Sequence, residues 1–159
     1  MSIGFIQAGK FHSMRAMTGG ALDIVISKLG ETLGIDAAKC HEIFETGDLG
    51  IVDGYAEAEV EQAMQMAYED IMAQVEFGLR YYSSSEDSSP LDKILLGGGG
   101  ASLKGLKEFI AERSGIETDT VNPFRYVECD ASVVGESGVS LALSNILAPA
   151  LGLAMRKFD

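Results

Sequence analysis

Basic residues and cysteines are scarce in this chain of 159 residues, and each scarcity excludes a class of function. Only 12 Lys and Arg stand against 24 Asp and Glu, which gives a formal net charge of −12. Nucleic acids and anionic membrane surfaces are bound by clustered cations, so we expect neither as a partner. Cys40 and Cys129 lie far apart, with no histidine at metal-ligand spacing. We therefore expect two free thiols in a reducing cytoplasm and no metal site.

Long hydrophobic runs are also missing. A membrane-spanning helix needs about eighteen or more consecutive apolar residues, and the chain has no such run. Its first residues, Met1–Phe5, lack the basic and then apolar order of a signal peptide. Hydrophobic residues nevertheless make up 47% of the sequence, enough for the core of one domain or of two small subdomains. The composition predicts a soluble, intracellular protein.

The first part of the chain, residues 1–82, has the pattern of a hairpin followed by helices. Ala8-Gly9-Lys10 separates two short strand-like runs, and Asp36 is suited to cap a helix at its N-terminus. The expected elements are strands over 3–7 and 11–17 and helices over 21–33, 37–46 and 57–82. Because the first strand begins almost at Met1, we expect this chain to be part of a longer protein with a preceding strand.

A polar loop over 83–91 leads into a second part, residues 92–159, in which strands and helices alternate. The expected elements are strands over 92–96 and 118–121, helices over 103–114 and 141–157, and a loop over 131–140. Pro149 is expected to begin a new piece within the last helix, since proline suits a first helical turn. The alternation predicts an α/β fold with a mixed sheet flanked by helices.

The segment Lys93–Leu106 is the most informative motif. A strand-like run ends in four glycines, Gly97, Gly98, Gly99 and Gly100, and a helical pattern follows. Glycine permits a positive φ and a close approach of the backbone to a ligand, so such a loop can direct N–H groups at an anion or nucleotide. The alternative is a tight turn that needs glycine only for packing.

The order of these motifs resembles the second half of an actin-like ATPase. Within that superfamily it is most similar to the PilM family of type IV pilus assembly, a relative of FtsA. The segments that carry the resemblance are the hairpin 3–17 with Thr18–Leu22, Leu33–Asp36, Ile94–Leu106, Gly115-Ile116 with Val121–Phe124, and Ala148–Arg156. The resemblance implies that residues 1–159 form the second lobe of an actin-like, ribonuclease H-like ATPase fold.

The same resemblance implies where ATP, with Mg²⁺, would bind. The nucleotide would lie against Gly97–Gly100, with Ser102 close by in sequence. His41 and Phe44 stand where the family has a Glu and a Lys that reach the ribose and the adenine. Phe44 could stack on adenine but cannot supply a charged donor. The other interpretation places Ile43 and Phe44 in the core and His41 on the surface.

The function that this resemblance implies is a non-catalytic cytoplasmic scaffold, peripheral to the inner membrane through its partners. Those partners would be the cytoplasmic tail of a PilN-like inner-membrane protein and the pilus assembly motors. We expect no catalytic residues, because phosphoryl transfer needs clamps on both walls of a cleft and this chain offers one. The alternatives are a lobe of an actin-fold small-molecule kinase and a nucleotide-free interaction domain. Self-association into a homo-oligomer through an exposed apolar wall is a further hypothesis.

Overall fold

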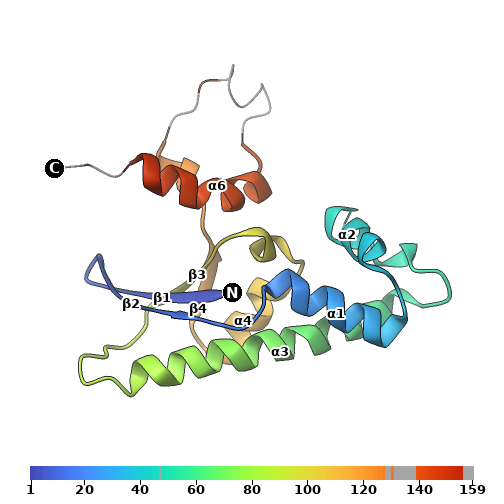
Figure 1. The fold of residues 1–159 in the computed structure, drawn as a ribbon, viewed down its shortest axis with the longest axis horizontal. Helices are drawn as coiled ribbons and strands as arrows, with labels where there is room; N and C mark the ends of the chain where they lie inside the picture. The colour runs from blue at the N-terminus through green and yellow to red at the C-terminus, as the bar shows by residue number, and fades with distance from the viewer. Residues whose placement is uncertain (47, 128–129, 131–138, 156–159) are drawn as a thin grey trace. The chain divides into compact units, whose positions relative to one another are not determined.

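The computed structural model describes residues 1–46, 48–127, 130 and 139–155 (Figure 1). The chain divides into two compact units, residues 1–91 and residues 92–159, and each is described by itself. The boundary falls at the end of the polar loop 83–91. Most of the loop expected over 131–140, together with Cys129, lies outside the described residues.

Residues 1–91 begin with the predicted hairpin. Strands β1 (Ser2–Gln7) and β2 (Lys10–Ala16) pair antiparallel, and Gln7 and Lys10 flank a two-residue turn. Both turn residues have positive φ, 49° at Ala8 and 74° at Gly9. Positive φ at both positions is typical of the turn whose twist matches that of paired strands. A two-residue turn therefore closes the hairpin, and Lys10 belongs to β2.

Three α-helices follow the hairpin, with bounds close to the predicted ones. They are α1 (Ala21–Leu33), α2 (Ala37–Thr46) and α3 (Glu57–Ser83), with a short 3-10 helix η1 (Leu49–Ile51) before α3. Gly34 ends α1 in the left-handed conformation, φ 66°, and its N–H donates to the Gly30 carbonyl. The Asp36 carboxylate accepts a hydrogen bond from the Lys39 N–H at 2.8 Å, which confirms Asp36 as the predicted cap.

The core of residues 1–91 lies between α1 and α3. The buried positions of α1 are Val25, Leu29 and Leu33, and those of α3 are Val60, Ala63, Met64, Ala67, Tyr68, Ile71, Met72, Val75, Gly78 and Tyr82. The buried positions of α3 recur at the three- and four-residue spacing of one helical face, and Met64 and Met72 pack as core residues. Phe5 of β1 stacks on Tyr82 with ring centroids 4.5 Å apart, so the hairpin joins this core.

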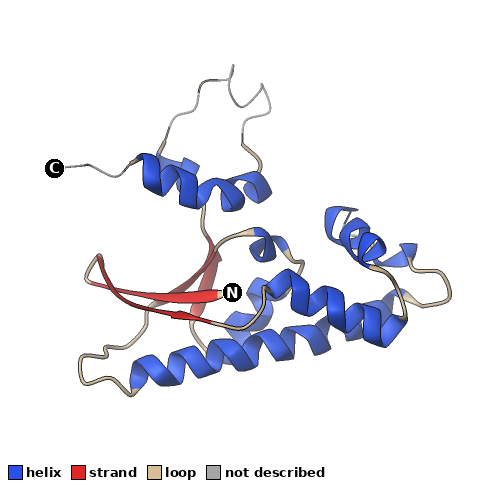
Figure 2. Cartoon of the chain, viewed as in Figure 1, coloured by secondary structure: helices blue, strands red, loops and turns tan. Residues whose placement is uncertain are grey.

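Residues 92–159 contain a parallel pair of strands (Figure 2). Strands β3 (Lys93–Leu96) and β4 (Glu117–Thr120) pair in parallel, and α4 (Leu106–Ser114) connects them. The described residues thus hold one antiparallel and one parallel two-stranded sheet together with helices, which is the α/β class predicted.

The helix expected to begin at Leu103 begins three residues later. A short 3-10 helix, η2 (Gly99–Ser102), occupies the end of the glycine segment instead. Gly105, just before α4, has φ 82°, a left-handed conformation that separates η2 from α4. The expected direct passage from glycine loop into α-helix was therefore wrong.

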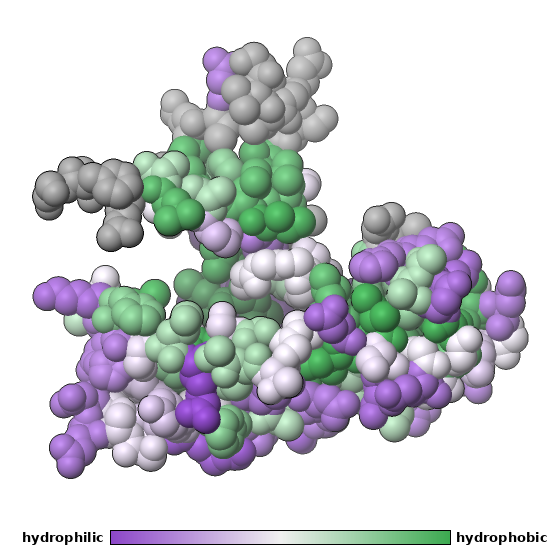
Figure 3. Space-filling model, viewed as in Figure 1, coloured by the Kyte–Doolittle hydropathy of each residue, from purple (hydrophilic) through white to green (hydrophobic). Residues whose placement is uncertain are grey.

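The last helix, α6 (Leu141–Ala154), is continuous through Pro149, so the predicted division into two pieces was wrong. A 3-10 helix, η3 (Pro123–Tyr126), precedes it in the chain. Several apolar side chains of α6 remain exposed, among them Leu143, Ile146 and Leu153. Figure 3 shows the green, hydrophobic surface that α6 presents in this view.

Candidate nucleotide site

The glycine loop, Gly97–Gly100, follows β3 directly. Gly98 has φ 84° and ψ 180°, a combination that is essentially restricted to glycine. A Cβ placed on Gly98 would meet no atom within 4 Å, so the backbone conformation, and not lack of space, demands glycine here. Open space therefore lies beside Gly98, in the direction that a side chain would take.

Among the described residues, the N–H groups of Gly99 and Gly100 donate no backbone hydrogen bond. The Gly98 carbonyl accepts from the Ala101 N–H at 3.0 Å, and the Gly100 carbonyl accepts from the Leu103 N–H at 3.2 Å. Gly99 and Gly100 stand at the start of η2, where the carbonyls of the helix itself cannot accept from their N–H groups. Backbone donors of this kind suit the oxygen or nitrogen acceptors of a nucleotide.

A buried polar pair of α6 adjoins the loop. Ser144 and Asn145 are 1% and 0% exposed, and the Asn145 carbonyl accepts a hydrogen bond from the Gly98 N–H at 3.2 Å. The Ser144 hydroxyl donates to the Asn122 side-chain oxygen at 2.9 Å. Both polar atoms of the Asn145 amide are buried, without a partner in the described residues. The helix that bonds to the loop therefore carries a desolvated side-chain amide.

Ser102 lies in the same unit as the loop, at the end of η2. Its neighbours Ala101 and Leu103 are buried, whereas Ser102 is exposed. The structure thus keeps Ser102 on the surface of the turn that continues the glycine loop. Its assignment to a nucleotide remains a prediction.

The other two predicted residues, His41 and Phe44, belong to α2 in residues 1–91. Their rings meet edge to face with centroids 6.2 Å apart. His41 is exposed and Phe44 half-buried, whereas Ile43 belongs to the core. The structure thus brings His41 and Phe44 together in one unit. It brings Gly97–Gly100 and Ser102 together in the other unit. The arrangement in α2 agrees with the second interpretation for Ile43 and His41, whereas Phe44, which that interpretation also placed in the core, is only half-buried.

Cys40, also of α2, is fully buried and holds a free thiol. Burial raises the pKa of its thiol, and the nearby Asp36 carboxylate raises it further. A thiol whose pKa is raised holds less of the reactive thiolate at neutral pH. Cys40 is therefore a packing residue, as its isolated place in the sequence predicts.

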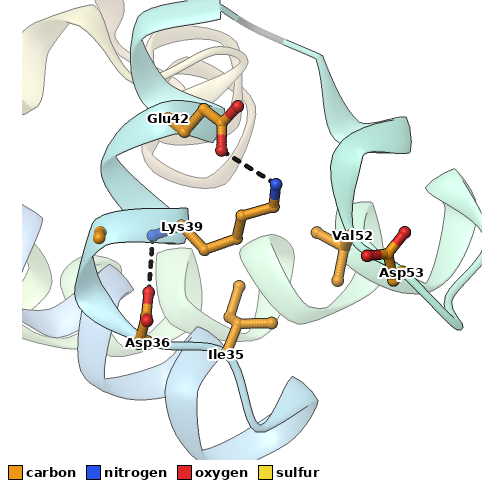
Figure 4. Close-up of a pocket in the computed structure, with 7 residues that line it drawn as sticks. Ile35, Asp36, Lys39, Glu42, Val52 and Asp53 are labelled. Atoms are coloured by element: carbon orange, nitrogen blue, oxygen red, sulfur yellow. Dashed lines mark hydrogen bonds and ion pairs between the residues drawn. The ribbon is translucent and has the colours of Figure 1, made fainter.

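A hollow that the sequence did not indicate lies beside α2 (Figure 4). It has a volume of about 480 Å³ and is lined by Ile35, Asp36, Ala38, Lys39, Glu42, Val52 and Asp53. The Lys39 ammonium forms an ion pair with Glu42 at 2.9 Å on its wall. Neither His41 nor Phe44 lines it. Segments on both sides of residue 47 form this hollow, so local sequence patterns carry no signal for it.

No group of three or more His, Cys, Asp or Glu side chains in the described residues is placed to hold a metal ion. In the same part of the chain, no helix has the length and apolar character needed to cross a membrane.

Comparison with known proteins gives two kinds of match. A family model described as "Type IV pilus assembly protein PilM" matches residues 52–158, which include the glycine loop and α6. No curated protein sequence matches the chain. Among solved structures, a PilM-PilN type IV pilus biogenesis complex is similar with a TM-score of 0.74 and 20% identity, over 98% of this chain and 42% of the other.

A second solved structure supports the same fold. The ethanolamine utilization protein EutJ from Carboxydothermus hydrogenoformans is similar with a TM-score of 0.59 and 17% identity, over 97% of this chain and 44% of that one. Both neighbours have the actin-like ATPase fold, which confirms the predicted fold class. The chain spans less than half the length of either structure.

Proposed function

Because this chain belongs to the PilM family of type IV pilus assembly proteins, we propose that it is the nucleotide-responsive second lobe of a non-catalytic pilus scaffold. The observation that carries the proposal is the family match, since it includes the glycine loop and the helix bonded to it. The actin-like fold adds support, because neighbours with an ATPase fold are consistent with nucleotide binding. The kinase alternative has no comparable observation in its favour.

The glycine loop is the part of the lobe that fits a nucleotide. The N–H groups of Gly99 and Gly100 would donate hydrogen bonds to the nucleotide. The open space beside Gly98 would admit it, and Ser102 would lie at the edge of the site. A bound nucleotide would supply negative charge and hydrogen-bond acceptors, and Mg²⁺ would arrive with its phosphates. His41 and Phe44 would approach the ribose and base only if α2 contributes as the family resemblance implies.

We propose that these 159 residues do not hydrolyse ATP. Phosphoryl transfer needs phosphate clamps and metal ligands around the γ-phosphate, on both sides of the nucleotide. By resemblance, the strand and the first lobe that supply them lie outside these residues. The role of nucleotide would then be to select a conformation, which requires different affinities for two states of the protein.

The proposed partner follows from the solved complex. The PilM in that structure assembles with PilN, and this chain resembles it along 98% of its length. We propose that the whole protein docks the cytoplasmic tail of a PilN-like inner-membrane protein. That contact would hold it at the cytoplasmic face of the inner membrane and connect it to the assembly motors.

A second candidate is a docking platform that binds no nucleotide. The observation in its favour is α2, where exposed His41 and half-buried Phe44 offer no equivalent of the acid and lysine expected by resemblance. In that case Gly97–Gly100 would serve only as the turn between β3 and η2. The two candidates differ in whether nucleotide changes the affinity for the tail.

The test is a titration of the full-length protein with a peptide of the PilN-like tail, in the absence and presence of Mg-ADP or Mg-ATP. Wild type is compared with Gly98→Val and with Gly54→Val, a matched control whose glycine has φ 86° and open space around it. We expect every protein to bind the tail, with a nucleotide-dependent affinity in wild type and Gly54→Val only. An affinity that nucleotide leaves unchanged in wild type would favour the second candidate, and no tail binding would contradict both.

A further inference from the structure

We propose that Pro149 is a positioning residue for the glycine loop, because it frees a carbonyl of α6 that then holds the Gly98 amide. This inference rests on the proposed nucleotide role of the loop for its functional consequence, but not for its structural claim. It assigns a purpose to a proline inside an otherwise continuous helix.

Pro149 removes one hydrogen-bond donor from α6. In an α-helix the N–H of each residue donates to the carbonyl four residues earlier, so position 149 would serve the carbonyl of Asn145. Proline has no N–H, and its ring crowds that same carbonyl. Since α6 continues to Ala154, the Asn145 carbonyl remains within a helix but without its helical donor.

The second step is that the glycine loop supplies the missing donor. The Gly98 N–H donates to the Asn145 carbonyl at 3.2 Å. Gly98 also has the glycine-only conformation, φ 84° and ψ 180°, at the point where β3 ends and η2 begins. The hydrogen bond that Gly98 donates to α6 thus restrains Gly98. The geometry of Gly98 in turn sets the direction of the N–H donors of Gly99 and Gly100.

Two further hydrogen bonds close a ring around this contact. The Val121 N–H donates to the Leu96 carbonyl at 2.7 Å, which joins the ends of β4 and β3. The next residue along, Asn122, accepts from Ser144 at 2.9 Å, and Ser144 is adjacent to Asn145. The paired residues are consecutive or nearly so in each segment: 96 and 98, 121 and 122, 144 and 145. The ring fixes α6 against the loop, so the freed carbonyl is held where Gly98 can reach it.

Replacing Pro149 by alanine should therefore loosen the loop while leaving the helix intact. Alanine restores the N–H at position 149, which would compete with Gly98 for the Asn145 carbonyl. Alanine is also a far better helix former than proline, so the thermal stability should not fall. A role limited to helix structure would move stability and nucleotide affinity together, whereas a positioning role lowers the affinity alone.

The experiment measures amide hydrogen exchange at the loop in full-length protein without nucleotide. In wild type we expect the Gly98 amide to exchange more slowly than those of Gly99 and Gly100. We expect Pro149→Ala to accelerate exchange at Gly98 by about two- to tenfold, which is the net worth of one hydrogen bond. Pro90→Ala, an exposed proline of the polar loop, is the matched control and should leave Gly98 unchanged.

Calorimetric titration with Mg-ADP then measures the consequence for binding. Pro149→Ala should weaken binding by a similar factor, with a melting temperature no lower than that of wild type. Exchange at Gly98 as fast as at Gly99 in wild type, or unchanged by a folded Pro149→Ala variant, would overturn the positioning role. Because exchange is measured without nucleotide, failure of wild type to bind Mg-ADP would contradict the proposed function and leave this inference to be judged by the exchange data.

Discussion

In residues 1–91, α1 and α3 bury a continuous stripe of apolar side chains, whereas in residues 92–159 a hydrogen bond from the Gly98 N–H to the Asn145 carbonyl holds the glycine loop to α6. The first arrangement depends on side-chain volume and the second on a few main-chain groups. A change of side chain should therefore act on the stability of the first unit and on the ligand-binding geometry of the second. Among the described residues, the candidate site belongs to the unit with fewer buried side chains.

The largest loss of stability among the variants that test this comparison should come from Ile71→Ala. Ile71 is 1% exposed in the middle of α3, and truncating a buried isoleucine costs about 2–5 kcal/mol in the free energy of unfolding. Met66→Ala on the same helix is the control, because Met66 is 47% exposed and should change stability by at most about 0.5 kcal/mol. Urea denaturation followed by circular dichroism measures both, and equal losses would contradict the assignment of the core.

A smaller effect is expected at Gly78, where α3 meets the hairpin. A Cβ there would lie 2.6 Å from the Ile3 Cδ1 atom and 3.0 Å from the Met17 Cε atom. Gly78→Ala should be nearly neutral, since these side-chain ends can move and alanine gains about 1 kcal/mol of helix propensity. Gly78→Leu should cost about 1–3 kcal/mol by overpacking, measured by the same denaturation. A neutral Gly78→Leu variant would show that the hairpin does not pack closely on α3.

The contact of Arg15 with α3 should contribute less again. Its guanidinium lies 4.5 Å from the ring centroids of both Phe77 and Tyr81, and both rings are partly exposed. Cation–π contacts of this kind are worth about 0.5–1 kcal/mol each at exposed sites. Arg15→Met, which keeps an apolar stem, should lose about 1 kcal/mol of stability, and Arg15→Lys should lose less. Equal losses for the two variants would argue against a contribution from the charge.

The smallest effect should be a pH dependence in residues 92–159. The Thr120 N–H and then Lys93 lower the pKa of Asp119, and Lys93 contacts Glu117 and Asp119 at 2.7 and 3.2 Å. A lowered carboxyl pKa contributes stability above the ordinary pKa of aspartate, and that contribution is lost as the pH falls through the lower, folded-state value. Thermal melts between pH 7 and about pH 3 should show this loss weakened in Lys93→Met. An identical profile for that variant would contradict a role for Lys93.

The sequence predicted the first unit well because its structure depends on local patterns. Helical spacing located α1, the Asp36 cap located α2, and two strand-like runs around Ala8-Gly9-Lys10 located the hairpin. In the second unit, local patterns did not locate the helix boundaries. Gly105 delays the start of α4, and Pro149 lies inside α6 without ending it. Both depend on which main-chain groups find partners, and residue types alone do not specify this.

The candidate site shows the same division. The four glycines identified the loop, but nothing in the sequence paired Gly98 with Asn145 or Asn122 with Ser144. A polar Ser-Asn pair within an apolar helix was the one available signal, and it marks burial without naming the partner. Asn122 was noticed through the family resemblance alone, and the structure gives it a contact that ties the end of β4 to α6.

The most direct test of the account is a calorimetric titration of Mg-ATP and Mg-ADP into the full-length protein. We predict binding by wild type and by Gly54→Val, and loss of binding by Gly98→Val, because valine cannot adopt the backbone conformation of Gly98 without strain. We also predict that the melting temperature of Gly98→Val is close to that of Gly54→Val. Binding that survives in Gly98→Val, or no binding by wild type at millimolar nucleotide, would contradict the claim that the glycine loop is a nucleotide site.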